Sequence, residues 1–112
     1  MKYGFIRVGA AVPKLKVANC EYNAAQIIEL IKRAKKEYIK FLVFPELCIT
    51  AYSCSDLFHQ DVLLMEASKQ LGNILEETKG IDLIAVIGMP VSLNNQLFNC
   101  AVVIQSGKIL GV

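Results

Sequence analysis

A single carboxylate, Glu46, follows a run of apolar residues at a point where it could serve as a general base. Residues 41–44 are Phe, Leu, Val and Phe, which leaves no polar face. This pattern predicts a strand that is covered on both sides, as in the middle of an α/β sheet. Pro45 has no N–H to donate to the sheet, so the strand should end there.

Glu46 is therefore expected at the carboxyl end of a core strand, the edge where open α/β sheets bind their ligands. Partial desolvation at that edge would favour the protonated carboxyl group and raise its pKa toward the range that suits a general base. The alternative is a solvated loop glutamate that caps the following turn. Residues 44–47 alone leave both interpretations open.

The cysteines and the one histidine suggest little further chemistry. Cys20, Cys48, Cys54 and Cys100 are scattered along the chain, which is typical of reduced thiols in a cytoplasmic protein. They form no CxxC pair, and with His59 they make no convincing zinc ligand set, so no metal site is predicted. Cys48 is interpreted as a small buried hydrophobic residue, and His59 as an ordinary turn or helix-start residue.

The composition indicates a globular chain that can bury a modest core. The chain has 112 residues, about one small domain, of which 54% are hydrophobic and 20% charged. This excludes disorder and is rather apolar for a free-standing domain of this size. The net charge is +2, and a basic cluster lies on the polar face and at the end of one predicted helix: Lys32, Arg33, Lys35, Lys36 and Lys40. Without an accompanying aromatic or glycine pattern, they suggest a solvated helix face and no nucleic-acid partner.

The N-terminal residues are predicted to form a strand. Arg7 interrupts their apolar run, and no small-residue cleavage site follows, so a signal peptide is not expected. No apolar run approaches the roughly 18 residues of a membrane span, so no membrane association is predicted.

The predicted order of elements along the chain is β-α-β-loop-α-β-β-β, without internal repeats or linkers. The ranges are 3–11, 19–38, 41–44, a loop at 48–59, 60–78, 83–88, 97–105 and 108–112. Gly80 should end the second helix, and Met89-Pro90 should close the strand 83–88. Ser106-Gly107 fits a two-residue hairpin turn. The architecture implied is a mixed parallel and antiparallel sheet in an α/β layer.

Each predicted helix has an apolar stripe with spacings of three and four residues, which keeps one face buried. The stripe of the first helix is Ala24, Ile27, Ile28, Ile31, Ala34 and Tyr38. That of the second is Leu64, Ala67, Leu71, Ile74, Leu75 and Thr78.

The segment 43–53, Val-Phe-Pro-Glu-Leu-Cys-Ile-Thr-Ala-Tyr-Ser, resembles the glutamate motif of the carbon–nitrogen hydrolase (nitrilase) superfamily. Residues 55–58 continue it in the manner of the N-terminal glutaminase domains of glutamine-dependent NAD synthetases. Residues 99–104 and 107–112 resemble the hairpin that precedes the family's catalytic lysine. Asn23 matches an asparagine usual in the family's first helix.

The resemblance implies a nitrilase-type α-β-β-α sandwich, of which residues 1–112 supply the N-terminal portion, a mixed sheet with helices on one face. Glu46 would be the general base of a Glu-Lys-Cys triad, and Tyr52 would line the glutamine pocket. The alternative for Tyr52 is a buried loop aromatic whose hydroxyl bonds the backbone. Ala51 stands where the family more often has glycine. Lys108 belongs to the hairpin turn, so the catalytic lysine and cysteine are expected beyond these residues.

By the same resemblance, the complete protein would release ammonia from glutamine for an ATP- and Mg²⁺-dependent synthetase domain that amidates deamido-NAD. No cofactor is expected in this segment. The implied partners are glutamine and the rest of the polypeptide. A second copy of the chain is predicted for another reason, since half a sandwich would leave an apolar sheet face exposed. Two rivals remain: a stand-alone amidase or carbamoylase with the same motif, and a non-catalytic assembly module.

Overall fold

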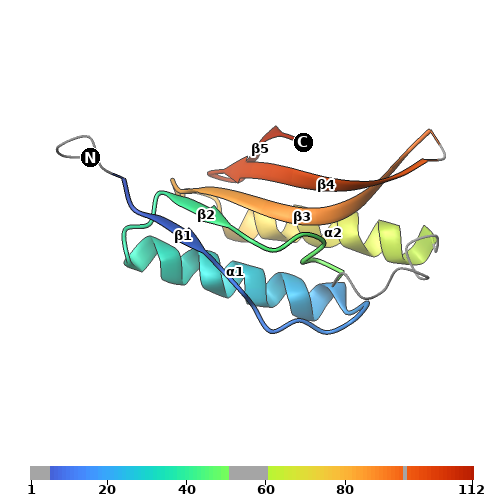
Figure 1. Ribbon diagram of the computed structural model, residues 1–112, viewed down its shortest axis with the longest axis horizontal. Helices are drawn as coiled ribbons and strands as arrows, with labels where there is room; N and C mark the ends of the chain where they lie inside the picture. The colour runs from blue at the N-terminus through green and yellow to red at the C-terminus, as the bar shows by residue number, and fades with distance from the viewer. Residues whose placement is uncertain (1–5, 51–60, 95) are drawn as a thin grey trace.

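The fold is a five-stranded sheet with two helices (Figure 1). The computed structural model describes residues 6–50, 61–94 and 96–112. Along the chain the elements are β1 (Val8–Ala10), α1 (Cys20–Lys36), β2 (Phe41–Val43), α2 (Asp61–Glu77), β3 (Ile84–Leu93), β4 (Gln96–Gln105) and β5 (Lys108–Gly111). The predicted order of strands and helices is confirmed.

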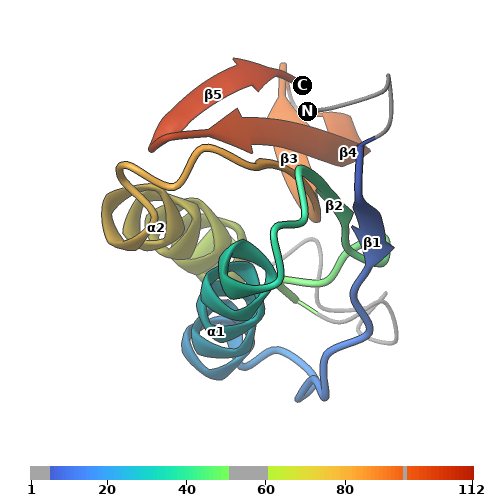
Figure 2. The same cartoon turned by 90° about the vertical axis from the view of Figure 1, so that its left-hand side faces the viewer.

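The sheet is mixed, with the strands in sequence order. β1, β2 and β3 are parallel, and β4 and β5 pair antiparallel to their predecessors. Figure 2 shows α1 and α2 on the same face of the sheet, and the two helices pack against each other. The predicted α/β class, with a mixed sheet and helices on one face, is therefore confirmed.

Helix α1 follows its predicted stripe closely. Asn19 caps it by accepting a hydrogen bond from the N–H of Tyr22 at 3.0 Å. All predicted stripe residues within the helix are buried. The exception is Tyr38, which is 75% exposed, so its predicted burial is wrong. The helix ends at Lys36 and the backbone of Tyr38 has a φ of 60°, which turns its side chain away from the helix face.

Helix α2 buries a face slightly different from the predicted one. Leu63 and Gln70 are buried, whereas Leu64 and Leu71, predicted to be inside, are only half-buried. The helix packs against both α1 and β3, and these two neighbours together determine which side is buried. The spacing of apolar residues along one helix does not show where its neighbours lie. The predicted stop is confirmed by the φ of +80° at Gly80.

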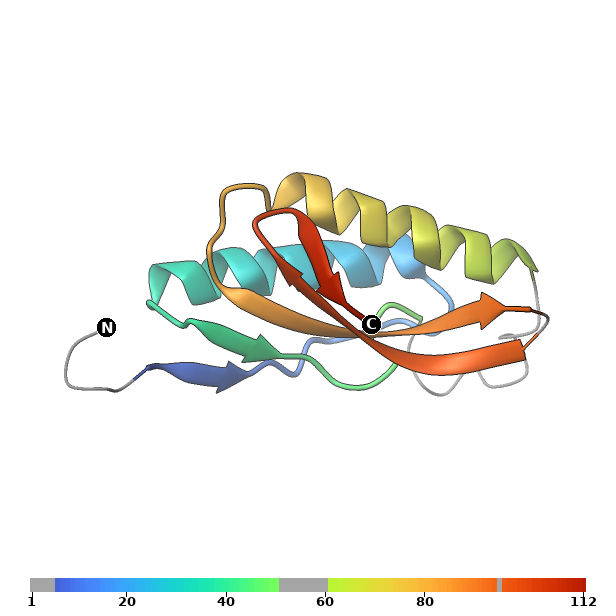
Figure 3. The same cartoon turned by 90° about the horizontal axis from the view of Figure 1, so that it is seen from above.

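Two strand boundaries differ from prediction. β1 is shorter than the predicted 3–11, although residues 1–5 lie outside the described part. β3 does not close at Met89-Pro90 but continues to Leu93, pairing with β4 throughout. Its ladder with β2 covers only Ile84 to Val86, so Pro90 lies where β3 has a strand on one side alone, a position that tolerates proline. Figure 3 shows β3 and β4 running side by side.

The second hairpin agrees with the prediction. Ser106 and Gly107 connect β4 to β5 with φ values of 51° and 78°. Positive φ at both central residues is what a type I′ two-residue turn requires.

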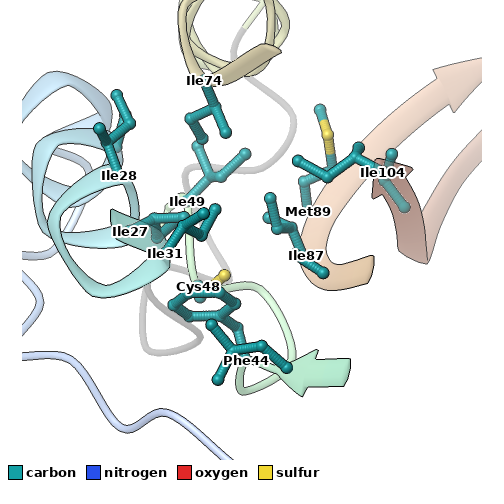
Figure 4. Packing of buried hydrophobic residues seen from close by; sticks show 14 of the residues in the cluster. Ile27, Ile28, Ile31, Phe44, Cys48, Ile49, Ile74, Ile87, Met89 and Ile104 are labelled. Carbon is teal, nitrogen blue, oxygen red and sulfur yellow. The ribbon is translucent and has the colours of Figure 1, made fainter. Parts of the chain in front are cut away.

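The core lies between the sheet and the helices (Figure 4). The register places Gly9, Leu42, Ala85 and Ile104 in one row across four strands. Leu42, Ala85 and Ile104 are at most 3% exposed, so this row faces the helices. Residues one position further on must face the opposite side.

The opposite face of the sheet, here called the open face, is apolar and partly exposed. Its central row is Ala10, Val43, Val86 and Val103. Val43 is 40% exposed and Val8, on the same face of β1, is 61% exposed. The expectation that the strand 41–44 is covered on both sides is therefore wrong for the described residues, because both helices lie on one face.

The surface of α1 carries a cluster of basic residues. Lys32 on α1 pairs with Glu77 on α2 at 3.7 Å, and both side chains are about half exposed. Contacts of this kind at a solvated surface contribute little stability. Within the described ranges, neither helix is long and apolar enough to cross a membrane.

We expect the isolated chain to self-associate through the open face, since soluble monomers seldom expose apolar patches above a few hundred Å². Val43→Lys should weaken this association without unfolding the chain, because the lysine would sit on the exposed side of β2. Light scattering at micromolar concentration, with dye binding as a second readout, measures the effect. A folded wild-type monomer that binds no hydrophobic dye would contradict the expectation.

Candidate active site

Glu46 lies just beyond the carboxyl end of β2, as predicted. The N–H of Phe44 still donates to the carbonyl of Val86 on β3 at 2.9 Å, and Pro45 then ends the pairing. A turn over residues 46–50 follows. The Glu46 side chain is exposed, so the predicted partial desolvation is not found in this chain. Glu46 lines a groove together with Val43 and Val86, which lie on the open face of the sheet that the helices do not cover.

Glu46 lines an open groove of about 300 Å³ at this edge of the sheet. Its lining is otherwise Val43, Phe44, Val86, Gly88, Asn99, Cys100 and Ala101. The groove therefore combines one carboxylate with the amide residue Asn99 above an apolar floor. Cys100 pairs with Met89 in the row that faces the helices, so its thiol lies on the other face of the sheet. A carboxylate in such a place can accept a proton from a group that enters the groove. An amide can donate a hydrogen bond to the same group.

Asn99 and Cys100 were not predicted to lie near Glu46. The β3–β4 register brings them there, since Gly88 pairs with Ala101 and Met89 with Cys100. The signal that could have found them is the short connection between Leu93 and Gln96, which fixes that register. Lys108 is the first residue of β5 and does not line the groove, which agrees with leaving it unassigned.

The turn that contains Glu46 packs closely against the backbone of Gly88. A Cβ atom at Gly88 would lie 2.4 Å from the backbone nitrogen of Leu47 and 2.7 Å from the Cα of Glu46. The carbonyl of Gly88 also accepts the N–H of Ile49 at 3.3 Å. Leu47 itself has a φ of 53°, which a leucine seldom adopts. The position of Glu46 thus depends on a close backbone contact that only glycine permits.

Cys48 is part of the core, as predicted, and Figure 4 shows it among the buried side chains. It is 0% exposed, and its thiol donates to the carbonyl of Gly88 at 3.5 Å. Burial raises the pKa of the Cys48 thiol to about 11, so the thiol stays protonated at neutral pH. A nucleophilic cysteine needs the thiolate and access to substrate, and Cys48 has neither.

The other candidate residues divide into two groups. Cys20 is buried and Cys100 is half-buried, and like Cys48 neither forms a disulfide. Tyr52, Ala51, Cys54 and His59 lie outside the described residues, so the role predicted for Tyr52 stays a prediction. In the described part of the chain, no three His, Cys, Asp or Glu residues are grouped so that they could hold a metal ion.

The chain belongs to the carbon–nitrogen hydrolase family, whose sequence profile matches residues 7–112. Within it, the chain is similar to glutamine-dependent NAD(+) synthetases. That of Mycobacterium leprae is 31% identical over 109 residues, and a putative one of Schizosaccharomyces pombe is 34% identical over 90 residues. These alignments cover 97% and 80% of this chain, but only 16% and 13% of the relatives.

Solved structures agree with this assignment. A glutamine-dependent NAD(+) synthetase from Cytophaga hutchinsonii superposes with a TM-score of 0.87 at 30% identity, over 95% of this chain and 18% of that one. An amidase from Nesterenkonia sp. superposes with a TM-score of 0.68 at 18% identity, over 91% of this chain and 40% of the amidase. The amidase supports the fold alone. The chain is thus homologous to one part of the NAD synthetases, the part with the carbon–nitrogen hydrolase fold.

Proposed function

We propose that this chain forms the N-terminal portion of the glutaminase domain of a glutamine-dependent NAD synthetase, with Glu46 as its general base. The observation that supports this most directly is the position of Glu46. Its carboxylate borders a groove at the carboxyl end of β2, in a chain that aligns over nearly its whole length with such synthetases.

In the proposed reaction the Glu46 carboxylate accepts the proton of a cysteine thiol. The resulting thiolate attacks the side-chain amide of glutamine, and the protonated Glu46 returns the proton to the leaving nitrogen, so that ammonia departs as a thioester forms and Glu46 is a carboxylate again. Glu46 then takes a proton from water, which attacks the thioester and releases glutamate. The proposal assigns the lysine and the cysteine to polypeptide outside these 112 residues, and the role of Tyr52 in the glutamine pocket is part of it.

The proposal also includes a second activity elsewhere in the same polypeptide. There, ammonia would amidate deamido-NAD in a separate domain that uses ATP and Mg²⁺. A stand-alone amidase is the weaker alternative, because the amidase structure shares only 18% identity with this chain whereas the synthetases share about a third.

The test uses the complete polypeptide that the proposal implies, here called the longer protein. It is supplied with deamido-NAD, ATP and Mg²⁺, and with either glutamine or ammonia as nitrogen donor. Mass spectrometry follows NAD and glutamate. The proposal expects NAD from both donors and glutamate in at least equal amount from glutamine. Hydrolysis of other amides without any NAD would favour the amidase, and no hydrolysis at all would favour an assembly module.

The 112-residue chain alone should release no ammonia from glutamine at an enzymatic rate. Cys48 is buried and protonated, and no lysine among the described residues lines the groove of Glu46. Without the other triad members, little more than binding effects is expected to remain. A coupled ammonia assay measures this. Turnover that Cys100→Ala removes and Cys20→Ala does not would refute the prediction and make Cys100 a nucleophile.

A further inference from the structure

A buried amide in α1 is bonded to the turn that carries Glu46. Asn23 is 0% exposed and lies among apolar core residues of the same helix. Its Oδ1 accepts the N–H of Lys16 at 2.7 Å, and its Nδ2 donates to the carbonyls of Lys16 and Ile49, both at 2.8 Å. The amide oxygen of Asn23 thus faces an N–H group and the amide nitrogen faces two carbonyls. This pattern fixes the orientation of the side-chain amide.

These bonds join three segments of the chain, of which the turn at Ile49 is distant in sequence from the other two. They connect α1 to the loop before it and to the turn over residues 46–50. A backbone bond adds to the connection, because the N–H of Ala18 donates to the carbonyl of Thr50 at 3.0 Å. Burying an amide costs free energy unless the amide is hydrogen-bonded. The three bonds of Asn23 offset that cost.

We propose that Asn23 is a positioning residue for Glu46, holding the far end of the turn in which the base lies. This rests on the proposed function only in naming Glu46 the base. The near end of the turn is fixed where Phe44 bonds β3, and its middle lies against Gly88. Asn23 and Ala18 fix the far end, at Ile49 and Thr50.

The backbone of Leu47 explains why such a connection is needed. Its φ of 53° is unfavourable for leucine, and such strained residues persist only where their surroundings hold them. Without the Asn23 bond to Ile49, the far end of the turn is held less firmly, so Leu47 can relax more readily toward an ordinary conformation. Glu46 would then move relative to the groove. The sheet and the helices should stay folded, because their backbone hydrogen bonds do not involve the side chain of Asn23.

Asn23→Leu tests this in the 112-residue chain, with Gln70→Leu as a matched control. Gln70 is also a buried amide, but its hydrogen-bond partners among the described residues, Glu66 at 2.9 Å and Asn73 at 3.4 Å, lie on its own helix. Hydrogen exchange is measured at the N–H groups of Ala18 and Ile49 and in β3. Asn23→Ser is a second variant that keeps a small polar side chain in case the leucine does not fold.

The inference expects exchange at Ala18 and Ile49 to accelerate about tenfold or more in the Asn23 variants, with β3 unchanged. The Gln70 variant should leave both reporters as in the wild type. Unchanged exchange at the two reporters, or equal acceleration throughout the chain, would overturn it. The second result would make Asn23 an ordinary core residue.

Kinetics of the longer protein provide the other readout. The Asn23 variants should lower kcat with glutamine about tenfold or more, with KM nearly unchanged and the rate with ammonia preserved. A loss confined to KM, or equal loss with both donors, would contradict positioning of the base. If the wild type has no glutaminase activity, the proposed function fails, while hydrogen exchange still decides whether Asn23 holds the turn.

Discussion

Replacing Glu46 with glutamine should abolish glutamine-dependent NAD synthesis in the longer protein and leave synthesis from added ammonia intact. The amide has nearly the shape of the carboxylate but cannot accept the thiol proton. Loss of a general base lowers rates by about 10²- to 10⁴-fold. Because Glu46 is exposed and accepts no hydrogen bond from another described side chain, the substitution should hardly affect folding. Parallel assays with the two nitrogen donors measure the effect.

Glu29→Gln is a suitable control, since Glu29 is an exposed glutamate on α1, outside the groove of Glu46. It should retain both activities. Equal loss with both donors in the Glu46 variant would mean that Glu46 is structural. An unchanged rate with glutamine would dismiss Glu46 as the base.

The placement of Glu46 could be predicted because it depends on local signals. An apolar strand followed by Pro45 fixes where the strand ends, and the next residue must then lie at the carboxyl edge of the sheet. Helix α1 was predictable for a similar reason, since its stripe and the Asn19 cap are both local in sequence. Tyr38 continued the stripe in sequence but not in space, because the helix had already ended.

The surroundings of Glu46 were not predicted, because they depend on pairing between strands, for which only the short β3–β4 connection gives a local signal. The β3–β4 register brings Asn99 and Cys100 to the groove, and the passage of the turn over Gly88 depends on where β3 lies beside β2. The exposure of Glu46 was missed for a related reason. An apolar strand predicts that both faces prefer burial, and it does not say which segment covers each face.

Gly88→Ala should have an effect nearly as large as that of Glu46→Gln, although it leaves the carboxylate in place. The added Cβ would come within 2.4 Å of the Leu47 nitrogen and 2.8 Å of the Glu46 carbonyl carbon. Both are backbone atoms, so no side chain can move to make room. The turn itself must shift, and a displacement of about 1 Å can cost about 10²-fold in rate. We expect that loss in glutamine-dependent synthesis, with the ammonia-dependent rate preserved, and a loss of about 1–3 kcal/mol in the free energy of unfolding.

Gly72→Ala provides the matched control, because it adds the same methyl group where nothing lies within 4 Å. Gly72 is inside α2, so alanine there should stabilise the protein by about 0.5–1 kcal/mol and leave both activities unchanged. Denaturant unfolding and the two-donor assay compare the pair. If Gly88→Ala keeps full activity with glutamine, the turn can move without displacing the base, and the contact with Gly88 does not position Glu46. If it loses both activities together, the shift has spread beyond the turn, and the close approach at Gly88 supports the whole fold more than this one carboxylate.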